Sequence, residues 1–321
     1  MSTIEATASP PAAEQRAPRP RPAARPTRRV RRGSVVPYAF VAPAFSLLLA
    51  FGVLPIAVAA AVSTTNMNIS GLADHHNITF VGAANYLRLV RDPAFWHALT
   101  NTGLFAVVGV PSIIVSSLGI ALLLHRSDGR FARALRAFYF MPAITAIVAV
   151  ALVWGYLYNS QFGLFNYALS TVGLGPVQWL SDPIVAKGSV ALVAIWRATG
   201  LNIVIFLAAL QGIPKEYLEA AAIDGANERQ RTWRITIPLL RFAISFVTIT
   251  TVINWLQFFD EPYVLTDGGP AGATTSISLY IFQEGFRFNQ FGFASAGSVV
   301  LFAIIAVITL VQLRMRRTDV D

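Results

Sequence analysis

The chain has 321 residues, of which 55% are hydrophobic and only 13% are charged, and its formal net charge is +9 at pH 7. Soluble globular chains carry about 25% charged residues, so this composition excludes an ordinary soluble domain and predicts an integral membrane protein. The sequence contains no cysteine, which excludes a disulfide framework and thiolate chemistry.

Residues 1–36 are rich in Pro, Ala and Arg. Such a segment cannot bury enough apolar surface to offset the entropy of ordering, so we predict a disordered cytoplasmic tail. Its arginines either attract anionic membrane lipid or only set the orientation of the chain, and we favour the second interpretation. The apolar run that follows is too long for the core of a cleaved signal peptide.

Six apolar runs follow the tail, and each is close to the roughly 20 residues that cross a bilayer as a helix. We therefore predict an all-α membrane protein with six transmembrane helices. We divide it into the tail (1–36), a first helix with an external segment (37–96), a core domain (97–315) and a cytoplasmic C-terminal tail (316–321). The runs cover residues 38–62, 102–124, 138–157, 188–210, 239–259 and 293–313.

The Lys and Arg residues are distributed unevenly between these runs. Twenty of the 25 lie in the tail, in or beside the segments after the second and fourth runs, or after the last run. Four lie in the other segments, and Arg197 lies inside the fourth run. Because cytoplasmic loops are enriched in Lys and Arg, we predict that both termini are cytoplasmic. The positive charge is a topology signal and does not indicate a nucleic-acid partner.

Three long segments, residues 63–101, 158–187 and 260–292, then lie outside the membrane. They contain aromatic residues and few charges. They could dock a soluble partner or only cap the helix bundle, and the sequence leaves both possibilities open.

The segment between the fourth and fifth runs is the most polar internal part of the chain. Pro214 suits the first position of a helix, and Gly225 can adopt the left-handed conformation that ends one. Asn227, followed three residues later by Gln230, is typical of a new helix cap. We predict a short helix, a sharp turn and a second helix on the cytoplasmic membrane surface.

No pattern of catalytic chemistry is present in the sequence. Neither of the two lysines, Lys187 and Lys215, belongs to a G-x-x-x-x-G-K-[ST] phosphate loop. The histidines lack metal-ligand spacing, and no G-x-S-x-G nucleophile elbow occurs. We therefore predict that the chain is not an enzyme and holds no cofactor or metal of its own, so that ATP-driven transport would need a separate ATPase.

Polar side chains are costly inside a bilayer and usually face a cavity, and here they gather in the fourth and fifth runs. In the fifth run, hydroxyl, amide and aromatic groups at helical spacing share one face, which suits a sugar with its hydroxyls and apolar C–H faces. The alternative is hydrogen bonding between helices, which we favour for Thr248 and Thr250. The predicted substrate-binding residues are Arg197, Asn202, Thr251, Asn254, Trp255, Gln257, Phe258 and Asp260.

Arg197 is the most informative of these residues, because a guanidinium in the middle of a span needs a partner. Asp260 is a candidate partner, although it stands near the outer end of the fifth run. Whether Arg197 contacts substrate or forms a structural ion pair is left open by the sequence.

The polar segment after the fourth run resembles the cytoplasmic "EAA" loop of binding-protein-dependent ABC importers. Glu-Ala-Ala is followed at the family spacing by Gly, Ile and Pro, and Ile237 replaces the usual Leu before the Pro. The resemblance implies a coupling helix, between helices 4 and 5, that docks into a cleft of the ATPase subunit. The alternative is a plain amphipathic surface helix. The implied coupling residues are Glu219, Ala220, Ala221, Asp224, Gly225 and Pro238.

A second stretch narrows the resemblance to carbohydrate permeases. Residues 254–270, which end in Gly-Gly-Pro, are similar to a segment of permeases related to the larger maltose-transporter membrane subunit. The likeness extends over roughly residues 37–315 and implies the type I ABC importer architecture. Substrate contacts carried over by position fall near Arg197, Ala198, Leu201, Thr251, Asn254, Trp255 and Phe258. Because most of these residue types differ from that subunit, maltose itself is not the expected substrate.

The resemblance implies a multi-pass permease of the prokaryotic inner membrane, in contact with lipid, that imports a carbohydrate. Its implied partners are a second, homologous permease, a dimer of ATPase subunits that bind ATP and Mg, and an extracytoplasmic solute-binding protein. One alternative is an importer of glycerol phosphate or a glycerophosphodiester, which the positive charge of Arg197 would favour. An ion-coupled secondary transporter is a further alternative, but it has no use for the segment around Glu219.

Overall fold

The computed structural model describes residues 36–125 and 129–318, and the regular elements within these ranges are helical. One isolated antiparallel bridge joins Thr65 and Phe80. The chain separates into two compact units, residues 1–52 and 53–321. Apart from Val36, the tail predicted over residues 1–36 lies outside the described residues.

The first unit contains α1 (Val36–Leu48) and most of a π-helical turn, η1 (Leu49–Val53). Both consist almost entirely of apolar residues.

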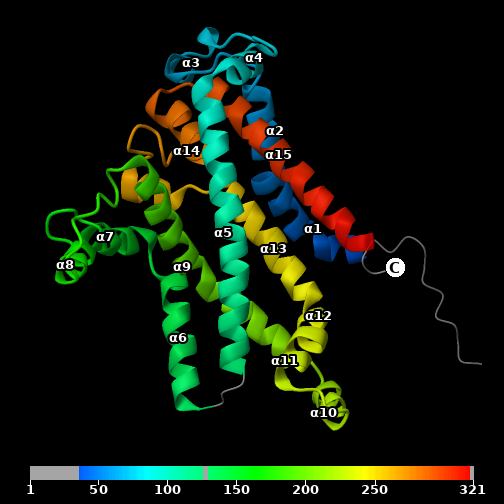
Figure 1. Ribbon diagram of the computed structural model, residues 1–321. Helices are drawn as coiled ribbons and strands as arrows, with labels where there is room; N and C mark the ends of the chain where they lie inside the picture. Colours follow the sequence, from blue (N-terminus) through cyan, green and yellow to red (C-terminus); the bar gives the residue numbers. More distant parts are fainter. Residues whose placement is uncertain (1–35, 126–128, 319–321) are drawn as a thin grey trace, which may run out of the picture. The chain divides into compact units, whose positions relative to one another are not determined.

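The second unit holds the other helices (Figure 1). In chain order these are α2 (Leu54–Val62), α3 (Ile69–Ala73), η2 (His75–Asn77), α4 (Ala84–Arg91), α5 (Pro93–His125), α6 (Arg130–Ile144), α7 (Ile147–Leu157), α8 (Leu164–Thr171), α9 (Pro183–Gln211), α10 (Lys215–Ile223), α11 (Glu228–Arg231), η3 (Thr232–Thr236), α12 (Ile237–Leu239), α13 (Arg241–Leu256), η4 (Pro262–Thr266), α14 (Ile277–Phe282), η5 (Gln283–Arg287) and α15 (Phe291–Thr318).

Four helical segments of the described chain are long and apolar enough to cross a membrane, and up to six are if each of two bent helix pairs counts as one span. The bent pairs correspond to the third and fifth predicted runs. The four segments are Tyr38–Val62, Pro93–His125, Pro183–Gln211 and Phe291–Met315; the bent pairs are Ala134–Ile144 with Ile147–Leu157 and Glu228–Leu239 with Arg241–Leu256.

The bends have a local cause that hydropathy does not reveal. Between α6 and α7, Thr145 and Ala146 have ψ values of 139° and 129°, so the backbone leaves the helical region and the two helices meet at 102°. Between α12 and α13, Leu240 has a ψ of 0° and the angle is 63°. The apolar pattern predicts how long a run is, but not that it stays straight.

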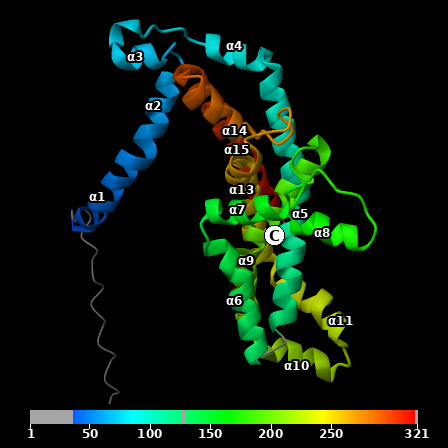
Figure 2. The same ribbon diagram turned by 90° about the vertical axis from the view of Figure 1, so that its left-hand side faces the viewer.

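Helix α9 is the central packing element of the second unit, because it contacts α5, α6 and α13 (Figures 1 and 2). Two buried apolar clusters line its length, one around Phe206 and one around Val190. Gly200 lets α6 approach closely, since a Cβ added there would lie 2.1 Å from the carbonyl oxygen of Tyr139. Burial of this kind stabilises helix contacts through dispersion and close packing.

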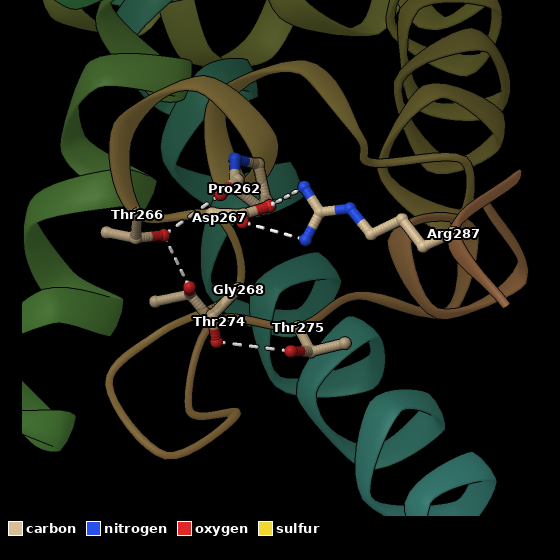
Figure 3. Close-up of polar contacts among 7 residues, drawn as sticks. All are labelled: Pro262, Thr266, Asp267, Gly268, Thr274, Thr275 and Arg287. Carbon is tan, nitrogen blue, oxygen red and sulfur yellow. Dashed lines mark hydrogen bonds and ion pairs between the residues drawn. The ribbon is translucent and has the colours of Figure 1, made fainter. Parts of the chain in front are cut away.

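The segment after α13 folds back on itself through polar contacts between its residues (Figure 3). Asp267 adopts the left-handed conformation, with a φ of 53°, and its carboxylate forms an ion pair with Arg287 at 2.6 Å. The Thr266 and Thr274 hydroxyls are 2.6 Å apart, and the Thr275 hydroxyl donates to the carbonyl of Gly268 at 3.1 Å. These bonds fix the shape of the turns between η4 and α14.

The same segment is attached to α5 and to Asp92, the residue that precedes it. The Ile277 N–H donates to the Thr102 hydroxyl at 2.8 Å, and the Tyr280 hydroxyl donates to the Asp92 carboxylate. Burial raises the pKa of Tyr280, and the bond to Asp92 raises it further, so this hydroxyl stays a donor at neutral pH. Residues 277–280 are therefore held against the start of α5, while docking of a partner on residues 260–292 stays a prediction.

Candidate functional site

A cavity of about 460 Å³ lies between α9 and α13. It is lined by all eight substrate-binding residues predicted from the sequence, which include some of the first residues after α13. Its lining consists of Ala143, Ala194, Arg197, Ala198, Leu201, Asn202, Ile205, Phe246, Thr250, Thr251, Asn254, Trp255, Gln257, Phe258, Phe259, Asp260 and Glu261. The structure thus brings together residues that are far apart in the sequence, such as Arg197 and Glu261, which are 64 positions apart.

The helical repeat explains why these residues meet. On α9, Ala194, Ala198, Leu201, Asn202 and Ile205 lie three or four positions apart and form one stripe. A matching stripe runs along α13, and the chain leaves the helix after Leu256 so that residues 257–261 close the end of the cavity. The sequence prediction of one shared face on the fifth run agrees with this geometry.

The amide side chains of the cavity differ in their exposure to solvent. Asn254 and Gln257 are exposed. The Asn254 amide nitrogen donates to the carbonyl of Thr250 at 2.9 Å, and the buried Asn202 likewise donates to Ala198 at 2.9 Å. Because each amide spends only part of its bonding capacity on its own helix, its oxygen can still accept a hydrogen bond from a ligand hydroxyl.

The two aromatic residues form a packed wall. Trp255 is only 3% exposed and Phe258 6% exposed, and their ring centroids are 4.8 Å apart. Phe258 also meets Phe105 edge to face, and the Trp255 indole lies where a Cβ on Gly109 would be. The sequence suggested rings that stack on a sugar, but packing against α5 covers most of both rings.

The hydroxyls of Thr248 and Thr250 form hydrogen bonds within α13, whereas the sequence analysis favoured hydrogen bonds between helices. Their hydroxyls donate within their own helix, Thr248 to Ile244 at 2.7 Å and Thr250 to Phe246 at 2.9 Å. Thr250 also lines the cavity. Threonine makes such bonds four residues back because its short side chain reaches the carbonyl of the preceding turn.

Arg197 forms a structural ion pair, and its main partner is Glu261. The Arg197 Nε donates to the Glu261 carboxylate at 2.7 Å, whereas the nearest oxygen of Asp260 is 3.6 Å from Nη2. The Glu261 side chain is 3% exposed and that of Arg197 28% exposed. The sequence analysis gave Asp260 as a candidate partner and did not single out Glu261 for this role, although the two consecutive acids at the end of the fifth run were a visible signal.

The segment between α9 and α13, called the Glu219 segment from here on, forms the predicted helix, turn and helix. Gly225 ends α10 with a φ of +81°. The Ala226 N–H bonds to the carbonyl of Ala221 at 2.9 Å, and the Gly225 N–H to that of Ala222 at 3.1 Å, which is the Schellman motif. Asn227 and Gln230 form a reciprocal capping box at the start of α11. Pro214 precedes the helix as its cap, one position earlier than predicted.

Most of the six proposed coupling residues lie on the surface of this segment. Glu219, Ala220, Asp224, Gly225 and Pro238 are exposed, whereas Ala221 is buried. Large apolar side chains accompany them: Ile223 is 87% exposed, and Tyr217 and Trp233 are exposed as well. The sequence analysis did not single out Ile223 or Trp233, although an isoleucine at the end of a polar helix is a recognisable signal.

A known protein family matches most of this chain. The family described as binding-protein-dependent transport system inner membrane component matches residues 94–318, which include the cavity and the Glu219 segment. The chain belongs to this family. Its membership supports the importer interpretation over an ion-coupled secondary transporter, and it makes the chain an inner-membrane component of a binding-protein-dependent system.

Individual relatives match this chain over most of its length. It is 37% identical to the lactose transport system permease protein of Rhizobium radiobacter over 278 residues, covering 85% of this chain and 91% of the relative. It is 36% identical to the trehalose/maltose transport system permease protein of Thermococcus litoralis over 287 residues, covering 87% and 93%. These relatives are permeases rather than enzymes.

A solved structure confirms the fold of this chain. The crystal structure of a bacterial alginate ABC transporter, in complex with alginate pentasaccharide-bound periplasmic protein, contains a chain that superposes with a TM-score of 0.78. The similarity covers 88% of this chain and 94% of that chain at 22% sequence identity. The expected ABC importer architecture is therefore confirmed.

Proposed function

We propose that this chain is the permease subunit of an ATP-driven importer, that it carries a carbohydrate, and that the cavity between α9 and α13 forms half of the translocation pathway. The observation that carries the proposal is the set of eight predicted residues around one cavity of about 460 Å³, a size that suits a small ligand. The names of the lactose and trehalose/maltose relatives support the substrate class.

The charges around Arg197 favour a neutral sugar over an anionic solute. Glu261 and Asp260 both lie within 4.0 Å of the guanidinium, so the three side chains carry a formal net charge of −1. Arg197 is already neutralised, and a phosphate at this position would meet two carboxylates. Like charges in a partly desolvated site repel. The geometry therefore argues against glycerol phosphate or a glycerophosphodiester.

The remaining components follow from the same proposal. A second, homologous permease completes the pathway, and a dimer of ATPase subunits binds ATP and Mg. An extracytoplasmic binding protein delivers the sugar to the side of residues 260–292. The positive charges around the Glu219 segment support a cytoplasmic position for that segment and for both termini.

The Glu219 segment is the proposed contact with the ATPase. Glu219 is exposed and takes part in no ion pair among the described residues, and the exposed Ile223 lies one turn further along α10. An anchoring apolar side chain next to an unpaired charge is typical of a protein interface. The rigid Schellman turn holds these groups in one geometry, so that movement of the ATPase can be passed to the spans.

Uptake by the reconstituted complex tests the substrate class. The complex, with its partner permease, ATPase and binding protein, is placed in vesicles and supplied with labelled lactose, maltose, trehalose or glycerol 3-phosphate. We expect uptake of a neutral sugar that requires ATP and is unaffected when ion gradients are abolished. Preferred uptake of glycerol 3-phosphate would contradict the neutral-sugar assignment, and uptake driven by an ion gradient without ATP would contradict the importer mechanism.

A matched pair of glycine variants tests the coupling assignment. Gly225 and Gly173 have φ values of +81° and +79°, and a Cβ on either meets nothing within 4 Å. Aspartate therefore introduces a similar backbone strain at both, on the order of 1 kcal/mol. We expect Gly225→Asp, and separately Glu219→Lys, to weaken co-purification with the ATPase or to uncouple hydrolysis from transport, whereas Gly173→Asp leaves both intact. Normal coupled transport in Gly225→Asp, Glu219→Lys and their combination would rule out this segment as the coupling element.

A further inference from the structure

A second polar cavity, of about 440 Å³, lies behind the Glu219 segment and shares no residue with the substrate cavity. Its wall combines the ends of α5 and α9 with the first half of α6 and the helices of the Glu219 segment. The lining consists of Leu122, His125, Arg136, Leu210, Gln211, Ile213, Lys215, Leu218, Glu228, Arg231, Thr232 and Thr236. Among the residues that the structure describes, three cationic side chains and one carboxylate line this cavity.

Two guanidinium groups in this cavity have buried donors without a partner. Arg136 donates from Nη2 to the carbonyl of Leu124 at 2.9 Å, but its Nε is buried and makes no hydrogen bond. Arg231 lies 3.7 Å from Glu228 through Nη2, and its Nε is also buried and unbonded. A buried charged donor without an acceptor is costly, and a bound ion is one of the recognised ways in which native proteins satisfy such a group.

The start of α10 adds a third source of positive potential. This helix has nine residues, and its cap, Pro214, offers no side-chain acceptor to the first N–H groups. Lys215 and Leu218, which belong to its first turn, line the cavity. The N-terminus of a helix carries a partial positive charge and free N–H groups, and it binds anions, phosphates in particular.

The position of the cavity along the spans indicates where its ligand comes from. The apolar helix Pro93–His125 ends at this cavity, because Leu122 and His125 both line it. The end of a span lies near the depth of the lipid headgroups. Leucine and isoleucine side chains line the cavity beside the cationic ones, so its wall has both apolar and basic parts. An anionic phospholipid has the same division between acyl chains and phosphate.

We propose that this cavity binds a phosphate group, held between Arg136 and Arg231 at the start of α10. The phosphate belongs either to an anionic lipid headgroup or to a soluble phosphate, since both present the same oxygens to the guanidinium groups. Because the cavity borders the Glu219 segment, a bound phosphate would stiffen that segment against the ends of α5 and α6. The proposal does not depend on which solute the protein transports.

The test is a thermal-stability titration of the purified transporter complex in an uncharged detergent. The probes are dihexanoylphosphatidylglycerol, dihexanoylphosphatidylcholine as the zwitterionic control, and inorganic phosphate. The variants are Arg136→Gln/Arg231→Gln, the charge-conserving Arg136→Lys/Arg231→Lys, and the control Arg229→Gln/Arg234→Gln, whose arginines are exposed and lie outside the cavity. The control removes the same charge from the same segment.

We expect phosphatidylglycerol to stabilise the complex, and the glutamine pair in the cavity to raise the half-saturating concentration about ten-fold or more. The lysine pair and the exposed control pair should stay close to wild type, which separates loss of the site from loss of folding. Equal stabilisation by inorganic phosphate, lost in the same variant, would assign the site to a soluble ligand. Stabilisation by neither probe, or an equal effect of the cavity and control pairs, would overturn the proposal.

Discussion

Removing Arg197 should destabilise the protein more than removing Glu261, although the two residues form one ion pair. The perturbation is Arg197→Met, Glu261→Met and the double variant, since methionine has a similar length and no charge. In Arg197→Met, the Glu261 side chain stays 3% exposed and keeps only Asp260, a like charge, near it. In Glu261→Met, Arg197 is 28% exposed and still lies 3.6 Å from Asp260.

The structure sets the size of the two effects. Breaking a buried ion pair by deleting one partner costs about 3–5 kcal/mol, and we assign this range to Arg197→Met because Glu261 is left unpaired. For Glu261→Met we expect about 1–2 kcal/mol, because solvent and Asp260 screen the remaining guanidinium. The double variant leaves no buried charge, so its cost should be smaller than the sum of the two.

The unfolding free energy of the three variants is measured in mixed micelles under conditions where refolding is reversible, because irreversible unfolding reports only a rate. A double-mutant cycle then gives the coupling energy. Equal costs for the two single variants, or a double variant equal to their sum, would refute the reasoning that the pair is buried asymmetrically and acts as a unit.

Three further predictions concern other parts of the chain. A reporter fused after residue 321 should report the cytoplasm and one inserted at Gly269 the outside, and the reverse pattern would contradict the proposed topology. Asn254→Ala should lower sugar affinity about five-fold or more in uptake assays while the complex still assembles; unchanged uptake would show that this amide only packs. Gly109→Ala should lower thermal stability by about 1–3 kcal/mol, because its Cβ would lie 2.3 Å from Trp255, whereas Gly119→Ala meets nothing within 4 Å and should be silent; equal stability of the two variants would refute the close packing.

The local features of this protein could be predicted from its sequence. The apolar runs match the helical segments because a membrane-spanning helix makes all its backbone hydrogen bonds within itself. Its length can therefore be read from the number of consecutive apolar residues. The turn at Gly225 and the cap at Asn227 were predictable for the same reason, since each depends on a few neighbouring residues. The stripes that line the substrate cavity follow from the helical repeat, which places residues three or four apart on one face.

Tertiary structure alone decided the features that depend on distant residues. Which acid neutralises Arg197 depends on how the chain leaves α13, and this puts Glu261 rather than Asp260 against the Nε. The burial of Trp255 requires the glycine on α5 that faces it, and no pattern within the fifth run contains that information. The cavity around Arg136 and Arg231 likewise forms only where separate helix ends converge. Burial and pairing are properties of contacts between segments, so they are fixed only when those segments pack.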